Sequence, residues 1–282
     1  MIETELTRAA LRDFPLPAQA DTDKDFHGQL LIVAGSENTP GAAVLCATAA
    51  MRAGVGQIRL ATAAAAAMHV AMQVPELWVI GVDRSKPLLD QLRDGIEAAD
   101  AIVAGPGIID EDFGKELATH LLCCSVPVVF DVGLLYRLEA LEDECREFDH
   151  GPILLPNARE LATLLGCSRE QVDADRLAAG RAAAERYNSL VLAKGAVSHV
   201  VAPDGRAWTF RGGAPGLGVA GSGDTLAGIV GALLARGAEP LTALLWGVLL
   251  HGEAGEMLSA KVRPVGFLAR EIPAEIPALL AR

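Results

Sequence analysis

The chain has 282 residues, of which 51% are hydrophobic and 4% aromatic, so one α/β domain with a substantial core fits its length and composition. Its formal net charge of −12 argues against nucleic acid as a partner, because DNA and RNA are themselves dense anions. No uncharged apolar run approaches the roughly 18 residues of a membrane span, and the charged N-terminus lacks an apolar signal core. We therefore expect a cytoplasmic protein with neither membrane nor nucleic-acid partners.

After a polar lead-in over residues 1–25, short apolar runs alternate with helical patterns. Strands are predicted at 29–34, 56–62, 77–82, 100–104, 127–131, 153–155 and 190–194. Helices are predicted at 40–53, 63–72, 86–98, 112–122, 157–165 and 169–187. Repeated βαβ units of this kind predict a mostly parallel central sheet with helices on both faces.

The last third of the sequence adds a small β-hairpin and more helices. Asp204 and Gly205 form the predicted turn between strands at 197–202 and 207–210. Helices are expected after Gly223, at 240–258 and at 264–281. Because no linker or change of composition divides the sequence, we expect a single domain over residues 1–282.

A glycine-rich turn, Gly221-Ser-Gly-Asp224, leads into the first of these helices. Apolar residues follow at helical spacing, and Gly237 is a suitable stop signal. The free N–H groups and positive dipole end of a helix favour a phosphate there, and the glycines allow its close approach. Asp224 would repel an anion, but it could accept the proton of a hydroxyl that attacks the phosphate. The alternative is that Asp224 is only the helix N-cap.

Two other motifs carry less weight. Residues 216–221 match G-x-G-x-x-G, but this pattern does not open an N-terminal βαβ unit, so we reject a dinucleotide fingerprint. His251 lies alone in an apolar helix and is interpreted as a hydrogen-bonded core residue.

Four further stretches end predicted strands, where α/β proteins place their sites. They are Gly35-Ser36 with Ala42 behind it, Gly105-Pro-Gly107, Asn157-Ala-Arg-Glu160 and Lys194-Gly195. Each alone could be ordinary turn chemistry. Because they share one sheet edge with Gly221–Asp224, we expect them to form a site together.

The motifs G-S-G-D at 221–224 and N-x-x-E at 157–160 resemble those of the ribokinase-like superfamily. Within it, the sequence is most similar to the ADP/ATP-dependent NAD(P)H-hydrate dehydratase family, over residues 24 to about 280. The matching stretches include Lys24 with Gly28, Met51 to Gly56, Pro75-Glu76, Asp131 with Gly133, Pro215 to Leu217, Ser222 to Gly228 and His251-Gly252.

The resemblance implies a role for each matching residue. Asp224 would be the catalytic base that deprotonates the hydroxyl of the hydrated nicotinamide ring, and elimination of phosphate would restore NADH or NADPH. The anion hole would be Gly221, Ser222 and Gly223. The nucleotide, ADP or ATP, would bind Lys194, Gly195, Ala196, Val197, Ser198 and Gly223. The hydrate would contact Ala42, Gly107, Asn157 and Asp224, and Glu160 would act through Mg²⁺ or water.

The sequence departs from the family pattern at Asn157, Ala214 and Ala220. Asn157 with Glu160 also resembles the superfamily's kinases, so a kinase for the hydroxyl of a sugar or vitamin precursor stays open. A nucleotide-binding regulator without turnover is the third alternative, although a pure binder would not need Asp224 beside phosphates. The superfamily resemblance also implies a homo-oligomer.

Overall fold

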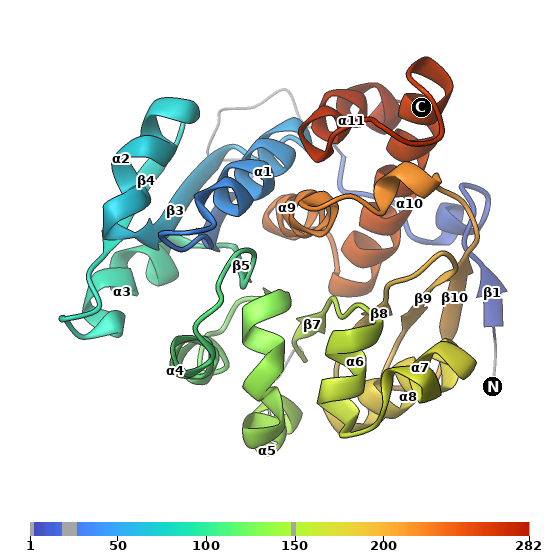
Figure 1. Ribbon diagram of the computed structural model, residues 1–282, viewed down its shortest axis with the longest axis horizontal. Coiled ribbons are helices and arrows are strands. Elements are labelled where there is room, and N and C mark those ends of the chain that lie inside the picture. The colour runs from blue at the N-terminus through green and yellow to red at the C-terminus, as the bar shows by residue number, and fades with distance from the viewer. Residues whose placement is uncertain (1–2, 19–26, 148–150, 282) are drawn as a thin grey trace.

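The computed structural model describes residues 3–18, 27–147 and 151–281 (Figure 1). Lys24, one of the matching residues, lies outside these ranges. One ten-stranded sheet runs through the molecule in the order β1-β10-β9-β8-β7-β6-β5-β2-β3-β4. The strands from β8 to β4 are parallel to their neighbours, whereas β8, β9 and β10 are joined by antiparallel pairing. The predicted mostly parallel sheet with a hairpin is therefore confirmed.

The strands are short and mostly buried. Their bounds are β1 Glu3–Glu5, β2 Gln29–Val33, β3 Gln57–Ala63, β4 Trp78–Val82, β5 Ala101–Ala104, β6 Val128–Phe130, β7 Ile153–Leu154, β8 Leu190–Ala193, β9 Ser198–Val201 and β10 Ala207–Phe210. Side chains alternate between the two faces, so that Leu30 and Ile32 of β2 join one apolar cluster while Leu31 and Val33 join the other.

Helices cover both faces of the sheet (Figure 1). One face carries α1 Pro40–Arg52, α2 Ala64–Gln73, α9 Ser222–Ala235, α10 Pro240–Lys261 and α11 Ile272–Leu280. The other carries α3 Leu88–Ala98, α4 Glu111–Leu121, the 3-10 segment η3 Val132–Leu141, α5 Glu142–Glu147, α6 Ala158–Leu165, α7 Arg169–Ala174 and α8 Arg176–Arg186. The α9 helix is apolar all round and packs between the sheet and α1 and α10, so it is a core helix with one end at the sheet edge.

The strand order places a topological switch between β2 and β5. From β2 the chain first builds outward through β3 and β4, then returns to the other side of β2 and continues through β5 to β8. Ligands of open α/β sheets bind beside the carboxyl ends of the strands at such a point. The glycine turns Gly35 and Gly105–Gly107 end the two strands that flank it, as expected for a site there.

The structure differs from the sequence analysis of local structure at three places. The expected helix over 169–187 is two helices, because Asp175 leaves helical geometry and its side chain caps α8 by accepting the Ala178 N–H (2.9 Å). The helix expected from 264 begins only at Ile272, after Pro264 and a left-handed Gly266 (φ 108°). The N-terminal lead-in contains β1, which pairs with β10 and completes the sheet edge.

Candidate active site

The α9 helix begins at the carboxyl edge of the sheet. Its N-cap is Gly221, which is left-handed (φ 90°), and Asp224 lies in the first turn. No side chain caps the helix, so the reading of Asp224 as the N-cap is wrong and its carboxylate is left available. The positive φ of Gly221 favours glycine, and a Cβ there would also displace the end of the Leu45 side chain, whose Cδ1 lies 2.4 Å away.

An ion pair with a fully buried carboxylate lies beside this helix end. Asp131 follows β6 and is fully buried, and its Oδ1 accepts a 2.8 Å hydrogen bond from Lys194 Nζ at the end of β8. A Cβ built on Gly223 would lie 3.4 Å from Lys194 Nζ and 3.7 Å from Asp131 Oδ2. The carboxyl ends of β6 and β8 therefore lie beside the first turn of α9. This agrees with the prediction that Lys194 and Gly223 share one edge of the sheet.

Sequence reasoning gave Asp131 no role, although it is the last residue of a predicted strand. Its Oδ2 is buried and has no hydrogen-bond partner among the described residues. An unpaired carboxylate oxygen is costly inside a protein unless a ligand or ion uses it. We therefore infer that Asp131 belongs to the site, which its strand-end position and its match to the family pattern could have indicated.

The charges at this edge alter one another's proton affinity. Burial and the neighbouring Asp131 carboxylate raise the pKa of Asp224 to about 6, against the opposing effect of Lys194. Burial alone would lower the pKa of Lys194, but Asp131, Glu160 and Asp224 outweigh it and raise that pKa. An acid that titrates close to neutral pH next to a permanently charged lysine suits general-base chemistry.

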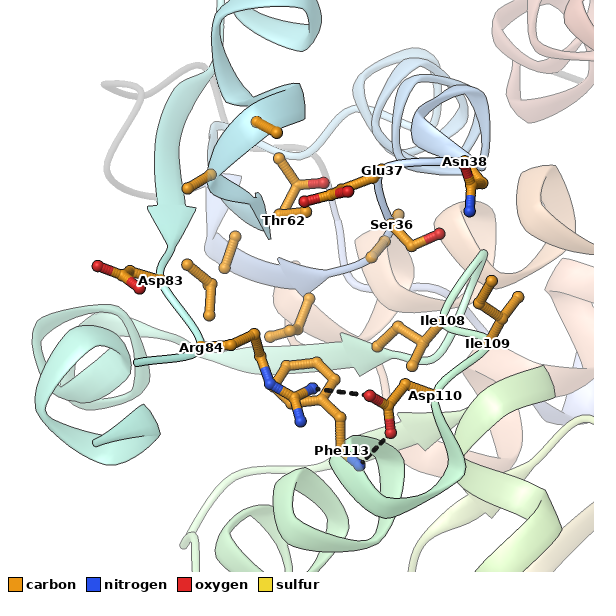
Figure 2. Close-up of a pocket in the computed structure, with 18 residues that line it drawn as sticks. Ser36, Glu37, Asn38, Thr62, Asp83, Arg84, Ile108, Ile109, Asp110 and Phe113 are labelled. Atoms are coloured by element: carbon orange, nitrogen blue, oxygen red, sulfur yellow. Dashed lines mark hydrogen bonds and ion pairs between the residues drawn. The ribbon is translucent and has the colours of Figure 1, made fainter. Parts of the chain in front are cut away.

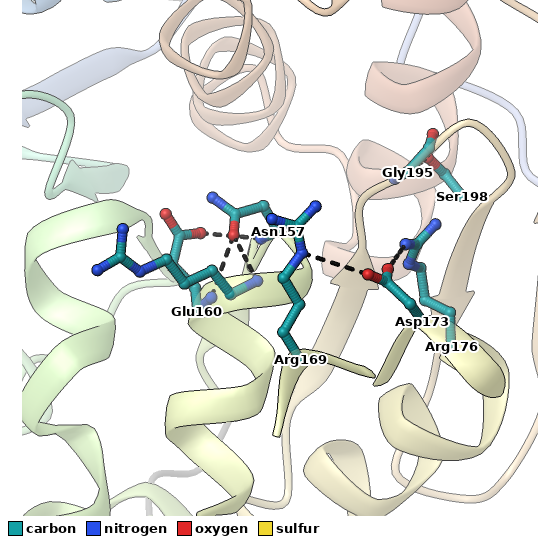
Figure 3. Close-up of polar contacts among 8 residues, drawn as sticks. Asn157, Glu160, Arg169, Asp173, Arg176, Gly195 and Ser198 are labelled. Carbon is teal, nitrogen blue, oxygen red and sulfur yellow. Dashed lines mark hydrogen bonds and ion pairs between the residues drawn. The ribbon is translucent and has the colours of Figure 1, made fainter. Parts of the chain in front are cut away.

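Asn157 and Glu160 form a capping box at the start of α6 (Figure 3). Asn157 Oδ1 accepts from the N–H groups of Arg159 (2.8 Å) and Glu160 (3.1 Å), and Glu160 Oε2 accepts from Asn157 N–H (2.8 Å). Glu160 is only 3% exposed. Burial raises its pKa, and the opposing effect of Lys194 only partly offsets this rise. The N-x-x-E motif thus has a structural function that also fixes Glu160 near Lys194.

We expect Asn157→Ala to lower the free energy of unfolding by about 1 kcal/mol, the usual effect of losing an N-cap. Urea unfolding measures this change. Ser168→Ala is the matched control, since Ser168 caps α7 in a second capping box away from Lys194. Both variants should lose similar stability, and only Asn157→Ala should also raise the KM for the hydrate that Asn157 is expected to contact. Equal effects of the two variants on KM would contradict a role for Asn157 at the site.

The loop after β8 is exposed at the same edge. Ser198 Oγ is 3.2 Å from the Gly195 N–H and 3.1 Å from the Gly195 carbonyl oxygen, which makes a tight turn (Figure 3). A Cβ on Gly195 would overlap the guanidinium of Arg176, whose partner is Asp173. The predicted nucleotide loop, Lys194 to Ser198, therefore begins at the Lys194–Asp131 ion pair. Arg176, a cation that sequence reasoning missed, lies beside the loop.

The two remaining predicted residues, Ala42 and Gly107, lie together where the chain continues beyond β2 and β5. Gly107 is left-handed (φ 68°), and a Cβ there would lie 2.6 Å from the Ala42 Cβ and 3.3 Å from the Gly35 Cα. The segments that follow β2 and β5 are thus in close contact. All the predicted site residues lie at one edge of the sheet.

His251 of α10 holds the first turn of α9. Its Nε2 is 3.0 Å from both the hydroxyl and the carbonyl oxygen of Ser222. Burial lowers the pKa of His251 to about 4, so the ring is neutral near pH 7. The interpretation of His251 as a hydrogen-bonded residue is confirmed, although its side chain is half-buried rather than fully in the core, and its partner belongs to the predicted anion hole.

Comparison with solved structures defines the class of protein. The ADP/ATP-dependent NAD(P)H-hydrate dehydratase of Bacillus subtilis, co-crystallised with ATP and Mg²⁺, superposes with a TM-score of 0.85 at 25% identity, over 99% of this chain and 98% of that one. A ribokinase-like superfamily protein of Enterococcus faecalis gives 0.84 at 23% identity, over 99% and 95%. The fold is therefore ribokinase-like.

Sequence comparison narrows the class. Residues 30–278 match the family model described as NAD(P)H-hydrate dehydratase. The chain is 43% identical over 287 residues to the ADP-dependent (S)-NAD(P)H-hydrate dehydratase of Xanthomonas campestris, and the alignment covers 98% of this chain and 96% of that protein. This chain belongs to the NAD(P)H-hydrate dehydratase family. It spans about half the length of the bifunctional NAD(P)H-hydrate repair enzymes that it also matches.

Proposed function

We propose that this chain dehydrates hydrated NADH and NADPH in a reaction driven by ADP or ATP. The observation that carries this proposal is Asp224, an acid of raised pKa in the first turn of α9, next to the Lys194–Asp131 pair. Membership of the family and the similarity to the Xanthomonas enzyme favour a dehydratase over a sugar or vitamin kinase.

The chemistry follows from the geometry. Hydroxide is a poor leaving group, so the ring hydroxyl is first phosphorylated. Asp224 accepts the hydroxyl proton as the oxygen attacks the terminal phosphorus, and the bond from that phosphorus to the nucleotide breaks. The bond from ring carbon to phosphate oxygen then breaks and a proton leaves the adjacent carbon, which restores the dihydronicotinamide and releases inorganic phosphate.

The first turn of α9 stabilises the transferring phosphate. The Ser222 N–H already donates to the Val219 carbonyl (3.2 Å), so Ser222 contributes through its side chain and its neighbours through their N–H groups. Helix N–H groups without helical partners and the helix dipole favour the negative charge that develops there. Lys194 and the loop to Ser198 bind the nucleotide. The hydrate contacts Ala42 and Gly107, beyond β2 and β5, and Asn157, which follows β7.

Mg²⁺ fits the residues that are present. Among the described residues no group of three or more His, Cys, Asp or Glu side chains could hold a metal ion by itself. Mg²⁺ commonly uses only one or two carboxylates together with substrate phosphates. The unpaired Asp131 Oδ2 and the nearby Glu160 are the side chains that would hold it, directly or through water. When bound, Mg²⁺ neutralises phosphate charge.

We expect kcat/KM to rise about tenfold per pH unit below the pKa of the base and to level off above pH ~6. Only deprotonated Asp224 accepts the hydroxyl proton, so activity is lost as the pH falls through about 6. A pH profile in constant ionic strength measures this limb. A profile that stays flat from pH 5 to 7 would contradict Asp224 as the base.

One incubation distinguishes the dehydratase from the alternative kinase. Hydrated NADH is mixed with the protein, Mg²⁺ and either ADP or ATP, and the absorbance of NADH is followed. We expect NADH to appear with at least one nucleotide and not without nucleotide. A phosphorylated ring that accumulates without NADH would instead indicate a kinase.

We further propose a cytoplasmic homo-oligomer. Among the described residues no helix is both long and apolar enough to cross a bilayer. Trp78 on the edge strand β4 is 69% exposed, and Met68 and Met72 of the neighbouring α2 are 69% and 76% exposed. Exposed apolar side chains on an open sheet edge support burial against a second copy. Light scattering that gives the monomer mass at micromolar concentration would contradict this.

A further inference from the structure

A cavity of about 460 Å³ lies next to the proposed reaction centre (Figure 2). It opens at the carboxyl ends of β2, β3, β4 and β5, on the side of the topological switch away from the predicted nucleotide loop after β8. Its volume falls in the range of ligand pockets. None of the residues predicted to contact the nucleotide, the hydrate or Mg²⁺ lines it, although Gly35 and Ser36 of the predicted stretch after β2 do.

The cavity adjoins the residues proposed to contact the hydrate. Gly35 and Ile108 belong to its wall. Gly107 precedes Ile108, and its built Cβ lies 3.3 Å from Gly35 Cα and 2.6 Å from Ala42 Cβ. A ligand whose reactive ring lies at Gly107 and Asp224 can therefore continue past Gly35 into the cavity. NAD(P)H hydrate is a dinucleotide and needs such space for the half that does not react.

The wall contains an unused hydroxyl. Thr62 is 2% exposed, and its Oγ1 has no hydrogen-bond partner among the described residues. A Cβ on Gly35 would lie 2.8 Å from this oxygen, so any other residue at position 35 would cover it. A buried, unpaired hydroxyl in the lining of a cavity is suited to a polar ligand group.

Opposite the hydroxyl is a flat surface made by Arg84 and Phe113 (Figure 2). The Arg84 guanidinium carbon lies 4.2 Å from the Phe113 ring centroid, and Arg84 Nη1 is 3.5 Å from an Asp110 carboxylate oxygen. The Asp110 side chain also caps α4 by accepting the Phe113 N–H (2.9 Å), which fixes the arrangement. Purine bases stack on aromatic rings and on guanidinium planes of this kind.

We propose that this cavity binds the adenosine half of the dinucleotide substrate, a proposal that rests on the proposed function. The adenine lies on the Arg84–Phe113 surface and the ribose faces Thr62 and Glu37, whose carboxylate is exposed at the rim. A carboxylate accepts hydrogen bonds from ribose hydroxyls, whereas a 2′-phosphate is usually met by arginine. Arg84 is already paired with Asp110, so it is not free to meet a 2′-phosphate. The Glu37 carboxylate gives the ribose end a negative charge, which favours hydrated NADH over hydrated NADPH.

Two variants and a truncated substrate test the site. Arg84→Ala and Thr62→Val are assayed with hydrated NADH and with hydrated reduced nicotinamide mononucleotide, which lacks the adenosine half. We expect each variant to raise KM for hydrated NADH about two- to tenfold, the effect of one lost polar contact. For each variant, kcat with hydrated NADH and the KM for ADP should not change. The kcat and KM for the mononucleotide hydrate should not change either.

Arg93→Ala is the matched control, because Arg93 is an exposed arginine that pairs with Asp90 on α3 and does not line the cavity. Thermal midpoints equal to wild type show that the variants fold. An unchanged KM for hydrated NADH, or a raised KM for ADP instead, would overturn the assignment. Failure of the wild type to turn over either hydrate would overturn the proposed function itself.

Glu37→Gln tests the ribose end. We expect wild-type kcat/KM to be about tenfold higher for hydrated NADH than for hydrated NADPH, and the variant to bring this ratio close to one. Equal values in the wild type, or a ratio that the variant leaves unchanged, would overturn the placement of the ribose at Glu37.

Discussion

Asp224→Asn lowers kcat by a factor of about 10² to 10⁴, the contribution expected of a general base. Asparagine keeps the size of the side chain and its place in the first turn of α9 but cannot accept the hydroxyl proton. The measurement is the rate at which NADH forms from its hydrate at saturating nucleotide and pH 8, where wild-type Asp224 is deprotonated because its pKa is about 6.

Asp90→Asn is the control for this substitution. Asp90 is also an acid in the first turn of a helix, but it lies on α3 and is exposed. The control should leave kcat unchanged. An Asp224→Asn variant within about threefold of wild type would mean that Asp224 is not the base, because even a modest general base contributes more.

Lys194→Met is expected to have the second large effect, on both stability and binding. Lys194 is the hydrogen-bonded partner of Asp131, which is fully buried, and its removal leaves a buried carboxylate with neither oxygen paired. Loss of one partner of a buried ion pair costs about 3–5 kcal/mol, and because the Lys194 side chain is 19% exposed we expect the lower end of that range. Urea unfolding should show this loss, and KM for ADP should rise because the nucleotide loop begins at Lys194.

The double variant Asp131→Asn with Lys194→Met separates the two effects. It removes the buried charge, so much of the lost stability should return while KM for ADP stays high. If Lys194→Met alone lowers the free energy of unfolding by less than about 1 kcal/mol, the ion pair is not a stabilising element of the site.

Much of the fold could be predicted because local patterns determine it. Short apolar runs gave the strands from β2 to β8, and helical spacing gave α1, α4 and α9. The errors arose where one side chain changes the local outcome. Asp175 breaks a continuous helical pattern because its carboxylate caps α8, and the short polar strand β1 exists only because β10 offers it a partner.

The site residues were predicted less completely than the fold. Motif resemblance predicted Asp224, Lys194 and Glu160, but a pattern does not show that Asp131 pairs with Lys194, 63 residues further along the chain. That contact depends on the sheet order, which places the ends of β6 and β8 beside α9. Thr62 and Arg84 were missed for the same reason, since the cavity exists only once β2, β3 and β4 are aligned.

The most direct test of phosphorylation followed by elimination is a product count. Hydrated NADH, ADP, Mg²⁺ and the protein are incubated, and NADH, AMP and inorganic phosphate are each quantified over one time course. We predict that the three products form in equal amounts and that no phosphorylated ring remains at completion. NADH formed without AMP and phosphate, or phosphate released without NADH, would contradict the proposed reaction.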